Sequence, residues 1–212
     1  MKKSFVIISV LVAVLVVFIM LAPKNTDKSN NKIAGLPWQI EVLPDGNATV
    51  FGITLGRSSF ADVKRLAGGG DIAIMSTGAA DVSLEMYVNR FQAGVLTGKL
   101  VLVAGLPQDQ LSVIRKRAIR SGGENKFKMH PDDRVRVVSS IIESMAFIPL
   151  VNLDEDVVRQ RFGKPAETIK QKTLTHMLYP EKGLDVIVDS EGKEVLQYIS
   201  PKFFKKLSDP LH

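Results

Sequence analysis

Histidines are the first residues in this chain that could do chemistry, and there are three of them: His130, His176 and His212. None has a second histidine at the spacing of a helical metal site. His176 stands beside Met177 in an alternating pattern, which predicts a half-buried strand residue. His130-Pro131-Asp132-Asp133 has the composition of a metal or acid–base cluster. A proline and two acids also begin a helix, and we favour that interpretation.

The other residue arrangements that carry catalysis are missing or have a structural explanation. The chain has no cysteine, which excludes disulfides, thiolate metal sites and cysteine nucleophiles. No G-x-S-x-G motif occurs, and Gly68-Gly69-Gly70 lacks the residues that complete a phosphate-binding loop. The carboxylates of Asp132-Asp133 and Asp154-Glu155-Asp156 stand at predicted helix starts, where capping explains them. The sequence therefore predicts no catalytic residues, no metal, no cofactor and a protein that is not an enzyme.

The charge distribution argues against nucleic acid as a partner. The chain carries +6, but residues 1–36 hold five lysines against one aspartate, which leaves +2 for residues 37–212. So weakly charged a domain lacks the positive field of a phosphate-backbone binder. The tightest basic cluster is Arg115-Lys116-Arg117, with Arg120 nearby. We interpret it as a solvated helix face; the alternative is contact of Arg115 and Arg117 with a protein or an acidic lipid.

Two adjacent aromatic residues are the second candidate contact. Phe203 and Phe204 fall in a short helix predicted over 201–207. Neighbouring positions of a helix cannot both face the core. One of the two is therefore expected at the surface, where it could bind a partner or the membrane.

The N-terminus predicts one membrane anchor, residues 1–22. Residues 4–22 carry no charge, and at 1.5 Å per residue they span about 28 Å, close to the thickness of a bilayer core. A cleavable signal peptide is the alternative. Its apolar region is usually shorter, and Met20 occupies a position where cleavage after Ala22 needs a small residue. We therefore expect an uncleaved anchor.

The segment after the anchor, residues 23–36, predicts a flexible tether, because it is polar, rich in Asn and Lys, and non-periodic. Lysines flank the anchor on both sides, so the charge bias is weak. The very short segment before the anchor favours a cytoplasmic N-terminus, which would place the following domain outside the cytoplasm. A reversed anchor with a cytoplasmic domain is the alternative.

Residues 37–207 predict a soluble α+β domain made of antiparallel sheets with short capped helices. Ser59 with Asp62 forms a capping box, Asp154 caps a later helix, and Gly68 and Gly163 end the two helices. Further helices are predicted at 107–119, 131–139 and 201–207. Strands are predicted at 38–42, 48–55, 72–76, 82–88, 94–96, 100–104, 141–151, 167–172, 175–179, 184–189 and 194–199.

The two halves of this domain resemble each other. Both show a strand, a capped helix, a glycine stop and an antiparallel meander, which predicts repeated modules at 37–105 and 141–207 joined by a helical connection, 106–140. The alternative is that any two helix-plus-meander units share caps and turn glycines. The matching pairs are Ile53/Ile148, Leu55/Leu150, Ser59/Asp154, Val63/Val158, Gly68/Gly163, Met86-Tyr87/Leu178-Tyr179 and Gly98-Lys99/Gly192-Lys193.

Each module also resembles a known family. The helix and stop DEDVVRQRFGKP (residues 154–165), the looser SFADVKRLAG (59–68), a tyrosine-bearing strand and a D-x-x-G-K hairpin resemble the SmpA/OmlA-type module of bacterial envelope proteins. Two in tandem resemble the β-lactamase-inhibitor-protein architecture, and the chain is similar to conserved hypothetical proteobacterial envelope proteins. The resemblance implies non-catalytic work through contacts with other proteins. That family is tethered by a lipidated cysteine, which this chain lacks, so residence in the outer membrane does not follow.

These observations predict a single-pass protein of the bacterial inner membrane whose periplasmic domain binds or scaffolds another envelope protein. The alternative is an enzyme or small-ligand-binding domain whose site is assembled from residues far apart in sequence. A deep pocket with converging titratable groups would favour the alternative. A shallow sheet with exposed apolar residues would favour protein binding.

Overall fold

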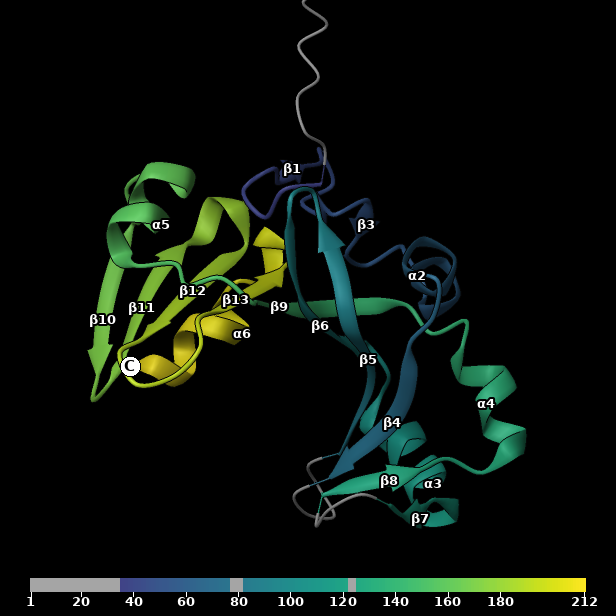
Figure 1. Ribbon diagram of the computed structural model, residues 1–212. Helices are drawn as coiled ribbons and strands as arrows, with labels where there is room; N and C mark the ends of the chain where they lie inside the picture. The colour runs from purple at the N-terminus through teal and green to yellow at the C-terminus, as the bar shows by residue number, and fades with distance from the viewer. Residues whose placement is uncertain (1–34, 77–81, 122–124) are drawn as a thin grey trace, which may run out of the picture. The chain divides into compact units, whose positions relative to one another are not determined.

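A computed structural model describes residues 35–76, 82–121 and 125–212. Within these ranges the chain forms one ten-stranded antiparallel sheet of order β10-β11-β12-β13-β9-β6-β5-β4-β8-β7, a three-stranded sheet β1-β2-β3 and several short helices (Figure 1). The predicted α+β class with antiparallel sheets and short helices is confirmed. The predicted anchor, 1–22, lies outside the described residues, and among those described no helix is long and apolar enough to cross a membrane.

The elements have the following bounds. The strands are β1 Glu41–Val42, β2 Ala48–Val50, β3 Ile53–Thr54, β4 Asp71–Ser76, β5 Val82–Ala93, β6 Leu96–Ala104, β7 Ile119–Arg120, β8 Lys126–Lys128, β9 Ile142–Pro149, β10 Glu167–Gln171, β11 Leu174–Tyr179, β12 Leu184–Asp189 and β13 Val195–Ile199. The α-helices are α2 Phe60–Ala67, α3 Gln108–Arg117, α4 Pro131–Val137, α5 Glu155–Phe162 and α6 Lys205–Ser208. Short 3₁₀ turns stand at η1 Pro180–Lys182, η2 Pro201–Phe203 and η3 Asp209–Leu211.

Capping fixes the helices where the sequence predicts them. Ser59 accepts from the backbone N–H of Asp62, and the Asp62 carboxylate accepts from the backbone N–H of Ser59, which completes the capping box of α2. Asp154 accepts from the backbone N–H of Val157 at the start of α5. Leu66 near the end of α2 is 53% exposed, because the helix buries the stripe through Phe60 and Val63.

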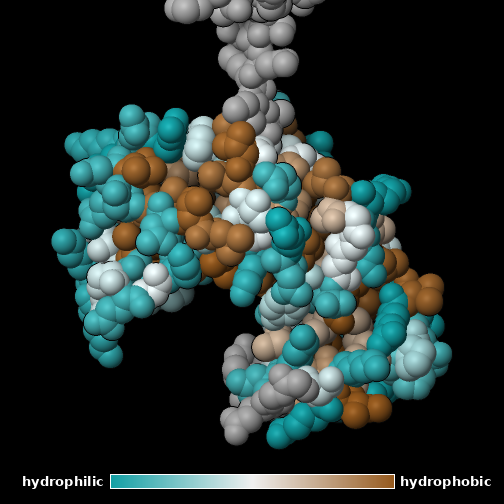
Figure 2. All heavy atoms as spheres, viewed as in Figure 1, coloured by the Kyte–Doolittle hydropathy of each residue, from teal (hydrophilic) through white to brown (hydrophobic). Residues whose placement is uncertain are grey.

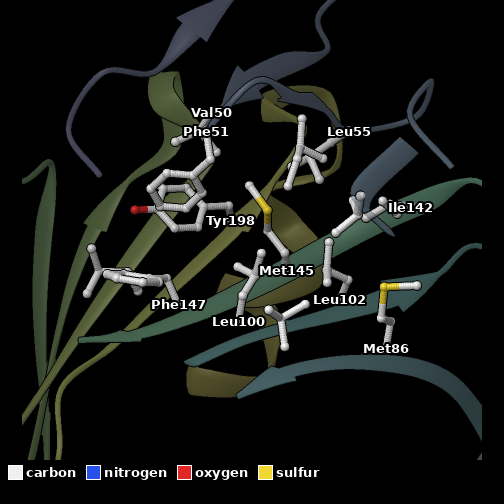
Figure 3. Packing of buried hydrophobic residues seen from close by; sticks show 14 of the residues in the cluster. Val50, Phe51, Leu55, Met86, Leu100, Leu102, Ile142, Met145, Phe147 and Tyr198 are labelled. Atoms are coloured by element: carbon white, nitrogen blue, oxygen red, sulfur yellow. The ribbon is translucent and has the colours of Figure 1, made fainter. Parts of the chain in front are cut away.

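The N-terminal strands are shorter than predicted. The expected strand 48–55 is divided into β2 and β3 by Phe51 and Gly52, both with φ in the left-handed region. The expected strand at 38–42 forms only over β1. Positive φ at a phenylalanine is strained, and the compensation is packing: the Phe51 ring lies 5.3 Å from that of Phe147 and 5.6 Å from that of Tyr198, centroid to centroid (Figure 3).

Two hydrophobic clusters lie on opposite faces of the large sheet. Met177 and Tyr179 belong to the main core with α2, α5 and the central strands, whereas Leu178 between them belongs to the second cluster. That second cluster consists of Leu178, Ile199 and Phe204, against which Ile169, Leu207 and Leu211 pack. The C-terminal helical turns therefore cover the sheet face behind β11 to β13.

The two predicted modules are alike in some features and differ in others. Helices α2 and α5 each lead into a meander that runs toward the centre of the sheet, and Val63 and Val158 are both fully buried. Other matches are not equivalent: Gly98 lies inside β6 while Gly192 lies between β12 and β13. The connection 106–140 is not wholly helical, since it also holds the hairpin β7–β8. Superposition of modules 37–105 and 141–207 stays a prediction.

Candidate binding groove between two helices

A groove lies between α3 and α4. It has a volume of about 420 Å³, within the range of small-ligand and side-chain sites. Four apolar side chains and several polar ones converge on it; the lining residues are Leu106, Asp109, Gln110, Val113, Ile114, Arg117, Asp133, Arg136, Val137 and Ser140. Along α3 they recur at three- and four-residue spacing, which makes them one face of the helix.

The most buried polar residue of the lining is Asp133, which is 2% exposed. Its Oδ1 accepts a hydrogen bond from Nη2 of Arg117. Its Oδ2 is buried and has no hydrogen-bond partner. An unsatisfied buried acceptor is uncommon in proteins and costs free energy. A ligand that brought an N–H or O–H group to Oδ2 would remove that cost.

The start of α4 explains how Asp133 reaches this position. His130 is the N-cap, Pro131 is the first helical residue, and the His130 Nδ1 accepts weakly from the backbone N–H of Asp132 at 3.4 Å. The prediction that this stretch begins a helix is confirmed. Capping does not account for Asp133, however, because it faces inward together with Val137 one turn later. Sequence reasoning missed its role, although the four-residue spacing of two buried positions could have indicated it.

The basic cluster of α3 is only partly a solvated face. Lys116 is exposed, but the Arg115 guanidinium carbon lies 3.3 Å from the centroid of the Phe127 ring, and Arg120 approaches the same ring at 5.7 Å. The Arg115 contact holds β8 against α3, and the Arg120 contact lies within the hairpin β7–β8. Arg115 is thus a structural residue, while Arg117, with its side chain 46% exposed, stands at the groove.

The segment that forms the groove is basic, although the charges of the lining itself balance, with Arg117 and Arg136 against Asp109 and Asp133. Residues 106–140 hold eight Lys and Arg against four Asp and Glu, a net of +4 within a domain of +2, so the rest of residues 37–212 carries −2. Lys116, Arg134 and Arg136 are exposed and form no ion pair with any described residue. Their charges are available to a partner.

The elements around the groove carry exposed apolar side chains. Val113 on α3 is 58% exposed and lines the groove, whereas Ile119 on β7 and Val135 on α4, 72% and 78% exposed, lie outside its lining. Figure 2 shows hydrophobic residues among hydrophilic ones at the lower right, where Figure 1 places α4 and β7. Apolar surface of this kind beside a groove is typical of a site that another molecule covers.

Of the two adjacent phenylalanines, one is buried and one is at the surface, as predicted. Phe204 is 7% exposed within the second cluster, so it offers no surface for a contact. Phe203 is 42% exposed beside the ammonium groups of Lys202 and Lys206, each 5.3 Å from its ring centroid. It lines a smaller cavity of about 220 Å³ and does not reach the α3–α4 groove.

The second buried ionisable pair is His176 with Asp185. His176 Nδ1 lies 2.8 Å from Asp185 Oδ2, and the two side chains are 7% and 1% exposed. His176 is therefore more buried than predicted. The turn that pairs Tyr179 with Leu184 places both residues on one sheet face, so hairpin register could have revealed the pair. Burial raises the pKa of the Asp185 carboxyl, and the hydrogen bond from His176 partly opposes this.

The described residues contain no group of three or more His, Asp or Glu side chains that could hold a metal. Comparison of the chain with protein families, with curated proteins and with solved structures finds no match. The site must therefore be interpreted from its own geometry and chemistry.

Proposed function

We propose that this chain is a single-pass protein of the bacterial inner membrane whose periplasmic domain binds another envelope protein through the α3–α4 groove and catalyses no reaction. The observation that carries the proposal is the coincidence, at one place, of a groove lined by apolar side chains, the exposed Val113 among them, and a buried carboxylate oxygen without a partner. Interfaces bind through a few such central, desolvated positions surrounded by a charged or polar rim.

A small-ligand site is the second candidate, because Asp133, Arg117 and Arg136 all line one groove. The exposed apolar surface beyond the groove favours the protein. A ligand that fits about 420 Å³ would not cover Ile119, which is 72% exposed two residues after Arg117 and outside the lining, whereas a protein interface of ordinary size extends beyond a single groove.

The test uses the absence of cysteine, which makes every introduced cysteine unique. Val113→Cys places one at the groove, and Gln160→Cys places one at an exposed position of α5 as a matched control. Each full-length variant is expressed in cells and treated with a maleimide–diazirine crosslinker. We expect one discrete crosslinked protein from Val113→Cys and none from Gln160→Cys. Equal products from both positions, or none from the groove, would refute the proposal.

The same variants test the orientation. A membrane-impermeant maleimide should label Gln160→Cys in intact spheroplasts. Labelling that requires lysis would place the domain in the cytoplasm and exclude a periplasmic partner.

A further inference from the structure

We infer that the segment held in the α3–α4 groove is an acidic, amphipathic peptide of the partner that also brings a neutral hydrogen-bond donor to Asp133. This inference rests on the proposed function, since it names the chemistry of the partner at the same site. Three features of the groove carry it, and each selects a different part of the peptide.

Charge at the rim selects acidic residues. The segment 106–140 carries +4 against −2 for the rest of residues 37–212, and Arg136 lines the groove without an ion pair among the described residues. Carboxylates on a bound segment would pair with Arg136 and with the nearby Arg134 and Lys116. Such complementarity raises association rates and selects partners of opposite sign.

The walls select apolar residues. Leu106, Val113, Ile114 and Val137 form the apolar part of the lining. A volume of about 420 Å³ accommodates only a few side chains. The peptide therefore needs a small number of aliphatic or aromatic residues spaced between its acids, in the manner of an amphipathic segment in a groove.

The floor selects a neutral donor and rejects a buried anion. Asp133 Oδ2 lacks a hydrogen bond, so a backbone N–H, a hydroxyl or an amide from the peptide would satisfy it. A carboxylate at the same depth would face a buried negative charge and be excluded. Acidic residues are thus confined to the rim.

The floor also separates a peptide from an anionic membrane. A lipid headgroup that entered the groove would meet the Asp133 carboxylate, and a flat bilayer would leave the concave walls unfilled. Basic residues with exposed apolar neighbours suit either partner, but the buried acceptor and the depth favour the peptide.

The experiment selects peptides on the full-length protein in zwitterionic nanodiscs, with a phage-displayed library of random 12-residue sequences as the probe. We expect enrichment of sequences that combine Asp or Glu with apolar residues. Their binding should fall at least about tenfold in Arg136→Glu and should weaken as salt rises, because rim charges act through screened attraction. Lys170→Glu, the same charge change on exposed β10, is the matched control and should leave binding unchanged.

Enrichment of neutral or basic peptides, or equal loss in both variants, would overturn the inference. If the nanodisc-embedded protein binds anionic vesicles and no peptide is enriched, the groove surface recognises lipid and the inference is wrong. The proposed function is judged separately by the Val113→Cys crosslink. A groove-specific crosslink with non-acidic peptides refutes only the peptide chemistry, whereas loss of the crosslink refutes the proposed function itself.

Discussion

Arg117 donates a hydrogen bond to Oδ1 of Asp133, while Oδ2 of the same carboxylate is buried without a partner. The Arg117 side chain is 46% exposed and that of Asp133 is 3% exposed, so the pair connects the surface of α3 to the buried part of the groove. The geometry of the pair leaves one carboxylate oxygen without a hydrogen bond in the free protein. A partner that donates a hydrogen bond to this oxygen would gain binding free energy. The pair should therefore matter to stability as well as to recognition.

Replacement of Arg117 by methionine should destabilise the domain by about 1–3 kcal/mol, because it leaves the Asp133 carboxylate buried with no partner. The value is at the lower end for buried pairs, since Arg117 is partly solvated. Urea unfolding followed by fluorescence of Trp38, the single tryptophan, measures it. Lys116→Met, one residue away and exposed, should change the free energy of unfolding by less than about 0.5 kcal/mol. Equal effects would contradict the structural role of the pair.

The Asp185 carboxyl should make stability depend on pH. Burial raises its pKa above the ordinary 3.8 in the folded state, so the folded state favours the protonated form. The associated stability is full below pH 3.8 and is lost as pH rises through the folded pKa. The amide of Asp185→Asn cannot ionise, so the variant does not lose this stability. Its free energy of unfolding should therefore rise relative to that of the wild type from about pH 4 upward. A difference between the two proteins that stays constant with pH would show that Asp185 does not titrate differently on folding.

Local patterns were enough to predict most elements. Ser59, Asp154 and the stop glycines act within one helical turn, so short-range chemistry decides them. Alternating patterns likewise predicted the strands of the second half at 167–172, 175–179, 184–189 and 194–199, which form β10 to β13. The division of strand 48–55 was missed because it depends on Phe51, whose positive φ is stabilised by rings from β9 and β13, far away in sequence.

The groove could not be predicted for the same reason. Arg117 and Asp133 are 16 residues apart, and their contact depends on how α3 and α4 pack. The cluster 115–117 was visible as charge, but charge alone does not show that Arg115 stacks on Phe127 while Arg117 enters a groove. Pairing across helices needs tertiary packing, which no single stretch of sequence contains.

Gly183 should tolerate no side chain. Its φ is +63°, and a β-carbon would lie 1.9 Å from the carbonyl oxygen of Ile199. Gly183→Ala should therefore cost about 3 kcal/mol or more, the sum of left-handed strain and a backbone clash. Gly68, at φ +70° and ψ 13°, has the same left-handed conformation with open space around its β-position and is the control; Gly68→Ala should cost only about 1–2 kcal/mol of strain. Thermal or urea unfolding distinguishes the two, and a larger loss at Gly68 would show that the clash is relieved in solution.

The cap of α2 should be measurable by itself. Ser59→Ala removes the acceptor for the Asp62 backbone N–H and should destabilise the domain by about 1 kcal/mol. The Asp62 carboxyl has a lowered pKa, chiefly because the backbone N–H of Ser59 donates to it. That contribution is present above pH 3.8 and is lost as pH falls through the folded pKa. Ser112→Ala within α3 should cause no loss, since alanine favours helix.

Val113→Glu is the sharpest test that the groove, and not exposed apolar surface in general, captures the partner. Val113 is 58% exposed, so the substitution should change stability by less than about 0.5 kcal/mol. It adds a negative charge to the wall of a groove that we infer binds an acidic segment, so capture should fall at least about tenfold. Leu150→Glu makes a similar change at a residue that is 60% exposed and not part of the groove. Binding of the crosslinked partner to each purified full-length variant, titrated at fixed salt, compares the two. Selective loss in Val113→Glu supports the groove, and equal loss in both would mean that the partner recognises exposed apolar residues wherever they lie.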